Sequence, residues 1–160
     1  MATPDFILRL RERIGNDLLW LPGATSVVFD GDAVLLVERA DDGEWTPVTG
    51  IVDPGEHPAR TAEREVLEET GVECTVEALV WVNVTEPRVY PNGDRSQYLD
   101  HTFRCRYLRG AAHVADDECS QVAWFPLDAL PEMDPVHAER IRTARSHTGP
   151  TRLHPATPAG

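Results

Sequence analysis

The sequence predicts a single α/β domain of the α+β type, in which a mixed β-sheet lies between helices. Its 160 residues are the length of one domain. With 41% hydrophobic and 26% charged residues, the composition is that of an ordinary globular protein. Short β-branched segments alternate with helical patterns and are joined in part by hairpin turns, which indicates a mixed sheet rather than regular βαβ units. We expect one folded domain over residues 1–145.

The N-terminal segment, residues 1–23, combines a short helix with an apolar leader. Apolar residues at helical spacing from Phe6 to Ile14 predict an amphipathic helix. The leader after it carries leucines and a tryptophan, so we expect it to pack on the domain. Two β-branched runs, 25–29 and 33–38, then flank an Asp-Gly-Asp sequence and predict a β-hairpin.

The central part contains the clearest helix. A short strand is expected over residues 45–48, before a helix over Pro58–Thr70. Proline suits the first turn of that helix, and Gly71 suits the left-handed stop after its last turn. Further strands are expected over 75–84 and 97–108, with a polar loop between them.

The C-terminal part begins with an expected strand over 121–125. Asp134 suits the N-cap and Pro135 the first turn of a closing helix that reaches about Arg145. Residues 146–160 are rich in proline and threonine, which predicts a disordered tail.

The composition excludes several classes of protein. The 27 acidic and 15 basic residues give a net charge of −12, and every basic residue is an arginine. Without lysine there is neither a P-loop nor a Schiff-base site. The acidic excess argues against nucleic-acid polymers and membranes as partners. Three cysteines without paired spacing, and no signal-like or membrane-spanning apolar block, predict a cytoplasmic protein.

The helix over 58–70 carries three carboxylates on one face. With Glu65 at zero, Glu68 lies at about −60° and Glu69 at about +40° around the helix axis. Like charges at these spacings repel, and acids in the last helical turn oppose the helix dipole. A bound divalent cation reverses both penalties, and clustered carboxylate oxygens suit Mg²⁺ or Mn²⁺. The alternative is a solvated acidic helix.

The segment before this helix contains a tight turn. Pro54 and Gly55 stand at the central positions of a type II turn that leads from a strand back over the helix. Gly50 has no side chain, so its carbonyl can approach a metal or phosphate closely. Glu56 is expected to pair with Arg64 and fix the loop to the helix.

Residues 50–72 resemble the Nudix box of the Nudix hydrolases. They match Gly, five residues, Glu, seven residues, Arg-Glu, an aliphatic, any residue, Glu-Glu, any residue, Gly and an aliphatic at every fixed position. The likeness extends more loosely over 25–131. It implies an α/β/α sandwich and Mg²⁺- or Mn²⁺-dependent hydrolysis of a nucleoside diphosphate linked to another group.

The resemblance also implies roles for residues of the box. Glu68 and Glu69 are then the principal metal ligands, Glu65 assists them, and the Gly50 carbonyl completes the site. Arg64 and Glu56 orient these ligands. The glycines that shape the box are Gly55 and Gly71.

A further carboxylate lies outside the box. MutT-like members carry a glutamate six residues before a tryptophan, and Glu118 stands six residues before Trp124. It is a candidate metal ligand or general base for the attacking water. The alternative is a solvated acid in a turn.

Substrate clues in the sequence disagree. Pro87, fifteen residues past the box, is typical of members that act on ADP-ribose, and Tyr90, eighteen past it, of those that act on diadenosine polyphosphates. The residues expected to contact the substrate are Arg88, Tyr90, Arg95 and Trp124. We expect cleavage of a nucleoside diphosphate derivative of one of these kinds, a small nucleotide being the partner. The alternatives are house-cleaning of nucleoside triphosphates and a non-catalytic nucleotide sensor. The oligomeric state is open, a homodimer included.

Overall fold

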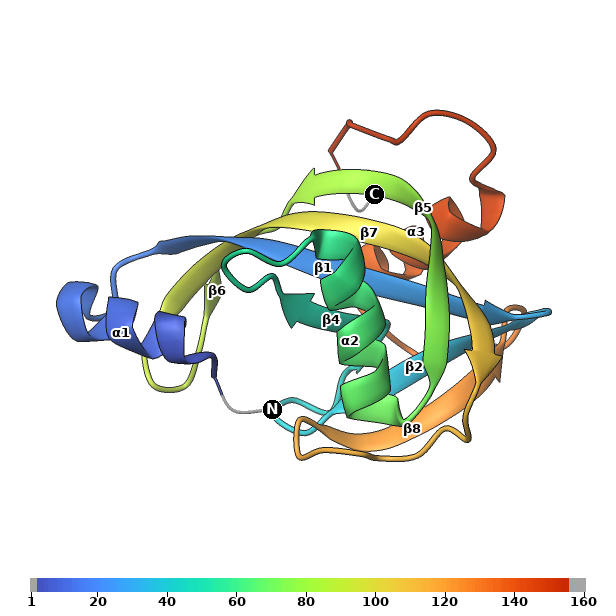
Figure 1. Ribbon diagram of the computed structural model, residues 1–160, viewed down its shortest axis with the longest axis horizontal. Coiled ribbons are helices and arrows are strands. Elements are labelled where there is room, and N and C mark those ends of the chain that lie inside the picture. Colours follow the sequence, from blue (N-terminus) through green and yellow to red (C-terminus); the bar gives the residue numbers. More distant parts are fainter. Residues whose placement is uncertain (1–2, 156–160) are drawn as a thin grey trace.

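A mixed β-sheet separates two helices that cover its opposite faces (Figure 1). The computed structural model describes residues 3–155. The elements follow one another in this order: α1 (Asp5–Ile14), β1 (Leu19–Asp30), β2 (Ala33–Arg39), β3 (Trp45–Thr46), β4 (Val48–Ile51), α2 (Pro58–Thr70), β5 (Glu73–Val84), β6 (Arg88–Val89), β7 (Arg95–Arg109), β8 (Cys119–Pro126) and α3 (Pro135–Ser146). This arrangement confirms the α+β sandwich that the sequence predicts.

The described residues form one eight-stranded sheet. Its main path runs β3-β2-β1-β7-β5, while β4 pairs with β1, β6 with β7 and β8 with β2. The long β1–β7 pair is parallel, from Leu19 opposite Ser96 to Phe29 opposite Arg106, and the other pairs are antiparallel. The predicted hairpin joins β1 and β2.

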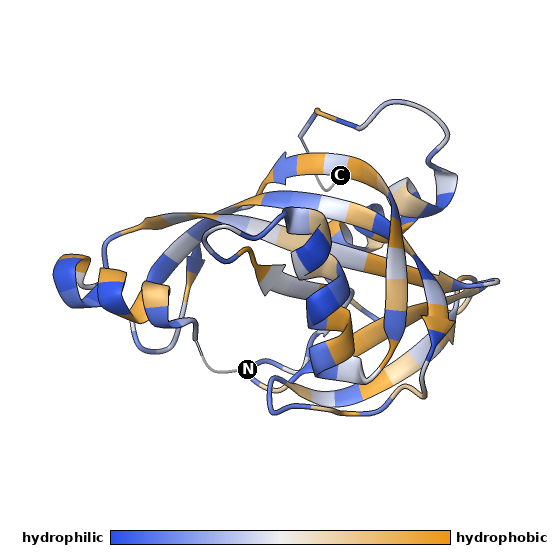
Figure 2. Cartoon of the chain, viewed as in Figure 1, coloured by the Kyte–Doolittle hydropathy of each residue, from blue (hydrophilic) through white to orange (hydrophobic). Residues whose placement is uncertain are grey.

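Alternate side chains of the central strand β1 fill two cores. Val28 packs in the cluster that contains Val66 of α2, whereas Val27 packs in the cluster that contains Ile141 of α3. Successive strand residues point to opposite faces, so one strand supports both layers. Figure 2 shows the result, with hydrophilic residues on the outer side of α2 and apolar stretches along the strands behind it.

Three segments differ from the expected elements. The leader enters the sheet as the start of β1, because Leu19 and Leu21 alternate inward and pack with Ile7 of α1. The single strand expected over 45–48 is divided into β3 and β4 at Pro47, which has no N–H to donate to a ladder. The loop between β5 and β7 contains the short strand β6.

The helices end where the sequence indicates. α2 occupies the predicted residues, and Gly71 at φ +69° donates its N–H to the Leu67 carbonyl. In α3 the Asp134 carboxylate accepts from the Val136 N–H at 2.8 Å, as expected of an N-cap. Within residues 3–155, no helix is both long and apolar enough to cross a membrane.

The segment after α3, part of the tail for which the sequence predicts disorder, runs along β5 through residue 152. Arg152 exchanges backbone hydrogen bonds with Val80 and Val82, at 2.9 and 3.0 Å. Its guanidinium lies 4.3 Å from the Trp81 ring centroid and pairs with Glu139 at 2.7 Å. These contacts join the segment to the sheet. The rest of the predicted tail, residues 156–160, lies outside the described residues.

Candidate active site

Two of the three predicted carboxylates on α2 point into the protein. Glu65 and Glu69 lie one turn apart and are 5% and 4% exposed, while the Glu68 side chain is 41% exposed. Because α2 packs through Ala62 and Val66, its acidic face begins at the edge of the buried stripe. The structure therefore places Glu65 and Glu69 inside and Glu68 at the rim.

Arg64 holds the carboxylates and the preceding loop together. Its guanidinium donates two parallel hydrogen bonds to Glu56, from Nε to Oε1 at 3.0 Å and from Nη2 to Oε2 at 2.9 Å. Its Nη1 donates to Glu65 Oε1 and to Glu68 Oε2, both at 2.9 Å. The Thr61 hydroxyl also donates to Glu56, at 2.7 Å. The predicted Glu56–Arg64 pair is confirmed, and these bonds hold the pKa of Glu56 below its usual value.

The box loop has the predicted turn. The Glu56 N–H donates to the Asp53 carbonyl at 3.0 Å, and Gly55 has a φ of +88°, which a type II turn requires at its third position. On β4, a Cβ added to Gly50 would overlap the Glu65 side chain. Gly50 is therefore needed for close packing of the strand on the carboxylate.

Burial and like charge act on the two inner carboxylates. Burial raises the pKa of Glu65 to about 7, although the neighbouring Arg64 opposes the shift. Burial raises the pKa of Glu69 to about 8, and the charges of Glu118, Glu65 and Asp116 add to that effect. Negative charge from α2 and from the loop before β8 thus gathers at one place, where a cation is favourable.

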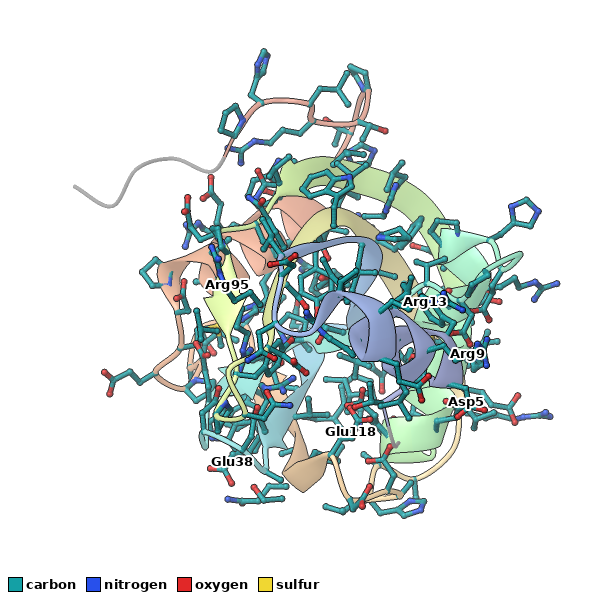
Figure 3. All side chains as sticks on the ribbon, turned by 90° about the vertical axis from the view of Figure 1, so that its left-hand side faces the viewer. Asp5, Arg9, Arg13, Glu38, Arg95 and Glu118 are labelled. Carbon is teal, nitrogen blue, oxygen red and sulfur yellow. The ribbon has the colours of Figure 1, made fainter. Side chains whose placement is uncertain are left out.

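The loop between β7 and β8 is anchored on the C-terminal end of α2. The His113 and Ala115 N–H groups donate to the Thr70 and Glu69 carbonyls, both at 3.0 Å. These carbonyls have no partner within the helix, so the loop satisfies them. The Glu118 carbonyl in turn accepts from the Ala40 N–H at 2.9 Å. Figure 3 shows Glu118 below α1 as the molecule is seen from the α1 side.

The carboxylate oxygens of α2 and of Glu118 are chemically suited to a divalent metal, but in this structure they do not surround a single position. Among residues 3–155 no three Asp, Glu, His or Cys side chains form a group ready to hold an ion. Two of the carboxylates, Glu65 and Glu68, instead pair with Arg64, both at 2.9 Å. The donor set, carboxylates with a strand glycine beside them, is the hard-oxygen type that Mg²⁺ and Mn²⁺ prefer. The buried, mutually repelling carboxylates are the observation that fits a cation.

A cavity of about 810 Å³ adjoins the carboxylates. Its wall includes Gly50, Glu65 and Glu118, which joins the box to the loop before β8. The cavity is also lined by residues from α1, β1, β5, β7 and α3, so elements from both sides of the sheet contribute to its wall. It is large enough for a nucleotide-sized molecule.

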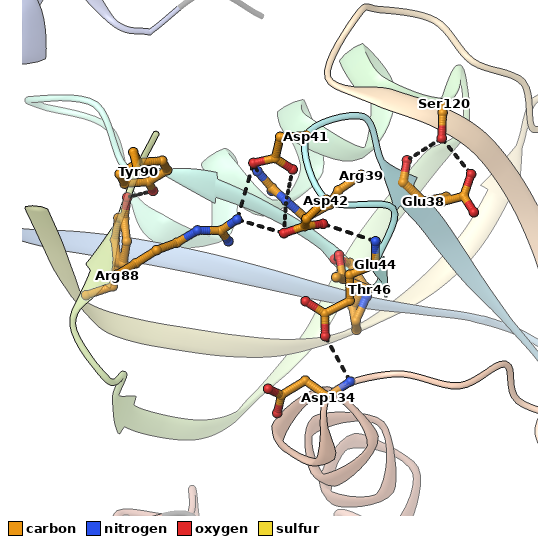
Figure 4. Close-up of polar contacts among 12 residues, drawn as sticks. Glu38, Arg39, Asp41, Asp42, Glu44, Thr46, Arg88, Tyr90, Ser120 and Asp134 are labelled. Atoms are coloured by element: carbon orange, nitrogen blue, oxygen red, sulfur yellow. Dashed lines mark hydrogen bonds and ion pairs between the residues drawn. The ribbon is translucent and has the colours of Figure 1, made fainter. Parts of the chain in front are cut away.

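Two of the four predicted substrate residues line this cavity. Arg88 pairs with Asp41 at 3.2 Å and with Asp42 at 2.9 Å (Figure 4). Its guanidinium lies 5.3 Å from the ring of Tyr90, whose hydroxyl is 2.9 Å from that of Tyr98. Both Arg88 and Tyr90 belong to the cavity wall.

The other two predicted substrate residues, Arg95 and Trp124, are not part of that wall. Arg95 is exposed on β7. Trp124 packs edge-to-face against Tyr107, with 5.5 Å between ring centroids, because its position on β8 faces the core beneath α2. Pro87 is also exposed and outside the wall. A single aromatic or arginine in the sequence does not reveal which way its strand faces.

Three polar residues of the cavity wall were not predicted from the sequence. Asp100 of β7 is 4% exposed, and Arg140 and His137 come from α3. Asp100 accepts from the Thr25 and Thr102 hydroxyls at 2.7 and 2.9 Å. The sequence feature that could have indicated this site is an aspartate in the middle of an apolar strand pattern, because a buried aspartate requires a polar partner.

The family follows from a comparison with known proteins. The model of the NUDIX domain family matches residues 20–144, most of the chain. The chain therefore belongs to the NUDIX family of hydrolases. Members of this family generally use divalent metal ions.

Individual relatives agree with this family. A MutT-like protein of Streptomyces ambofaciens is 32% identical over 125 residues, which are 78% of this chain and 75% of the relative. The 8-oxo-dGDP phosphatase NUDT18 of Homo sapiens is 32% identical over 146 residues, or 88% of this chain. The chain spans only 40% of that longer relative.

A solved structure supports the fold. An ADP-ribose pyrophosphatase of Streptococcus suis superposes with a TM-score of 0.67 at 23% identity, covering 84% of this chain and 98% of the other. At this identity the likeness concerns the arrangement of helices and strands alone.

Proposed function

We propose that the chain hydrolyses a phosphoanhydride bond of a nucleoside diphosphate derivative, with Mg²⁺ or Mn²⁺ as cofactor. The observation that carries this proposal is the burial of Glu65 and Glu69 near Glu118, with Glu65 and Glu118 in the wall of a nucleotide-sized cavity. A purely structural acidic helix has no reason to bury two carboxylates against a third. This also disfavours a non-catalytic sensor.

The metal would be held by Glu65, Glu68, Glu69 and the carbonyl of Gly50. When bound, it supplies positive charge for the diphosphate and lowers the pKa of a water molecule. Arg64 contacts Glu65 and Glu68 at 2.9 Å, so it orients these ligands through its grip on Glu56.

Glu118 is assigned the removal of a proton from the attacking water. It lines the cavity and lies close enough to Glu69 to raise the pKa of that residue. Because Glu118 lies on a separate loop, it can act on water while the carboxylates of α2 hold the metal. Arg88 and Tyr90 are assigned contacts with the group beyond the diphosphate.

The substrate class has two candidates. The first is a diphosphate linked to a second group, such as ADP-ribose or a dinucleoside polyphosphate, for which the large cavity offers room. The second is a nucleoside triphosphate, normal or oxidised. An oxidised guanine nucleotide, in that case a diphosphate, is named as the substrate of one relative, the 8-oxo-dGDP phosphatase.

A substrate panel tests the proposal. The purified chain is incubated with nucleoside diphosphate sugars, dinucleoside polyphosphates and nucleoside triphosphates, with Mg²⁺, Mn²⁺ or chelator, and the products are separated by chromatography. We expect metal-dependent release of a nucleoside mono- or diphosphate from at least one substrate. Turnover that is unchanged in the Glu69→Gln variant, or the lack of any turnover with both metals, contradicts the assignment.

A further inference from the structure

Arg140 of α3 is a buried arginine on the wall of the same cavity. Its side chain is 5% exposed. Nη2 lies 3.2 Å from Asp100 Oδ2, and Nη1 donates to His137 Nδ1 at 3.1 Å. Its third nitrogen, Nε, is one of two buried side-chain nitrogens in residues 3–155 that have no hydrogen-bond partner. A buried N–H without an acceptor is destabilising, so a ligand that brings an acceptor is favoured there.

The same contacts fix the protonation of His137. Arginine has only donors, so His137 Nδ1 must accept from Arg140 and cannot carry a proton. Burial, together with the charge of Arg140, lowers the pKa of His137 to about 3, so the ring is neutral near pH 7. Its one proton is then on Nε2, which is a second N–H donor. His137 also lines the cavity.

The charge of Arg140 is already balanced. Asp100 is 6% exposed in its side chain and pairs with the guanidinium, and it also accepts hydrogen bonds from the Thr25 and Thr102 hydroxyls. A phosphate would bring a second negative charge to a neutral, buried pair. A neutral acceptor such as a carbonyl oxygen suits two N–H donors without that penalty.

We propose that Arg140 and His137 recognise a ring carbonyl of the nucleobase, so that keto purines are preferred to adenine. This inference rests on the proposed function in one respect, because it takes the cavity to bind a nucleotide. Guanine and hypoxanthine present a carbonyl oxygen beside the ring nitrogen N7, and an arginine commonly donates to this edge. Adenine carries an amino group in place of the carbonyl, which would oppose one donor with another. The inference favours guanine-type substrates over ADP-ribose and diadenosine compounds.

The sharpest probe is a pair of nucleosides without phosphate. Inosine and adenosine differ in the carbonyl and amino group at C6, and their affinities are measured by ligand-detected NMR titration without metal. We expect inosine to bind about 5-fold or more tightly than adenosine, the lower range for one specific base contact. Equal binding, stronger binding of adenosine, or binding of neither nucleoside overturns the proposal.

Two variants connect this preference to the named residues. Arg140→Lys keeps a cation for Asp100 but lacks the fork of donors, and His137→Leu keeps the Arg140–Asp100 pair but lacks the second donor. We expect each to bring the affinity ratio close to one. Arg145→Lys is the matched control, since Arg145 lies on the same helix and pairs with Asp32 at 2.6 Å outside the cavity wall. An unchanged ratio in both cavity variants overturns the proposal, and the second variant keeps the test decisive if the first does not fold.

Hydrolysis separates this inference from the proposed function. The ratio of kcat/KM for inosine triphosphate to that for adenosine triphosphate should be as high in Arg145→Lys as in the parent. It should fall close to one in Arg140→Lys and in His137→Leu. If no nucleotide is hydrolysed while inosine is preferred and Arg140→Lys loses that preference, the carbonyl site stands and the hydrolase assignment fails. If both bases are hydrolysed equally, and Arg140→Lys changes nothing, the hydrolase stands and the carbonyl site fails.

Discussion

Gly50 of β4 and Glu65 of α2 are packed so closely that a Cβ on the glycine would overlap the Cγ, Cδ and Oε1 atoms of the glutamate. The glycine therefore fixes where the buried carboxylate lies. This contact joins the strand before the box loop to the helix after it. This close approach, rather than a left-handed backbone conformation, explains why residue 50 is a glycine, since Gly50 has no positive φ.

The first prediction concerns this contact. Gly50→Ala should displace Glu65 and reduce kcat by about 10- to 100-fold, the range for residues that support metal ligands. Gly149→Ala is the matched control, since the added Cβ meets nothing within 4 Å there. Steady-state kinetics and thermal unfolding of both variants provide the measurement. Gly50→Ala with the activity of the control would show that the position of Glu65 is unimportant.

Much of the box could be predicted from the sequence because its constraints are local. The bounds of α2, the turn at Gly55 and the Glu56–Arg64 pair depend on residues within one loop and one helix. The cavity wall could not be predicted in the same way. Arg140 and Asp100 are 40 positions apart in the chain and meet only because α3 packs on β7.

The second prediction concerns the charge of Glu69. This carboxylate is 4% exposed and lies near the charges of Glu118 and Glu65. Glu69→Gln should lower kcat by about 100-fold or more, since a direct ligand matters at least as much as its supporting residues. The metal-free variant should be at least as stable as the parent, because glutamine removes the cost of burying a carboxyl whose pKa is raised to about 8 in the folded protein. Exposed Glu132→Gln is the control, and parent-like activity of Glu69→Gln would refute its role.

The third prediction concerns the pH dependence of stability at His137. Its pKa is lowered from 6.5 to about 3 in the folded protein, chiefly by burial. Between these values the unfolded chain binds a proton that the folded chain does not, so this residue reduces the free energy of unfolding as the pH falls. Urea unfolding at about pH 7 and about pH 5 should show a smaller acid loss in His137→Gln than in the parent. Exposed His154→Gln should lose as much as the parent, and equal losses in both variants would contradict the shift.

The fourth prediction concerns Arg88 and Tyr90, whose side chains line the cavity. If they contact the group beyond the diphosphate, Arg88→Ala and Tyr90→Phe should change the ranking of substrates by kcat/KM more than the rate on the best small diphosphate. Arg95→Ala is the control from the same loop region, because Arg95 is exposed outside the cavity wall. A uniform loss across the panel would instead indicate a structural role, arising from the ion pairs of Arg88 with Asp41 and Asp42.

The last prediction separates Glu118 as the base from Glu118 as an ordinary loop acid. General-base catalysis contributes about 10²- to 10⁴-fold, so Glu118→Gln should lower kcat within that range with little change in KM. Asp116→Asn and Asp117→Asn change the same charge in the same loop and should stay within a few-fold of the parent. Asp116→Asn also keeps an oxygen that can accept from the Glu118 N–H, as Asp116 does at 3.0 Å, so the loop is retained. A general electrostatic effect would lower all three variants alike. Equal, small losses at the three positions would remove Glu118 from the mechanism and assign the base to Glu65 or Glu68 on α2.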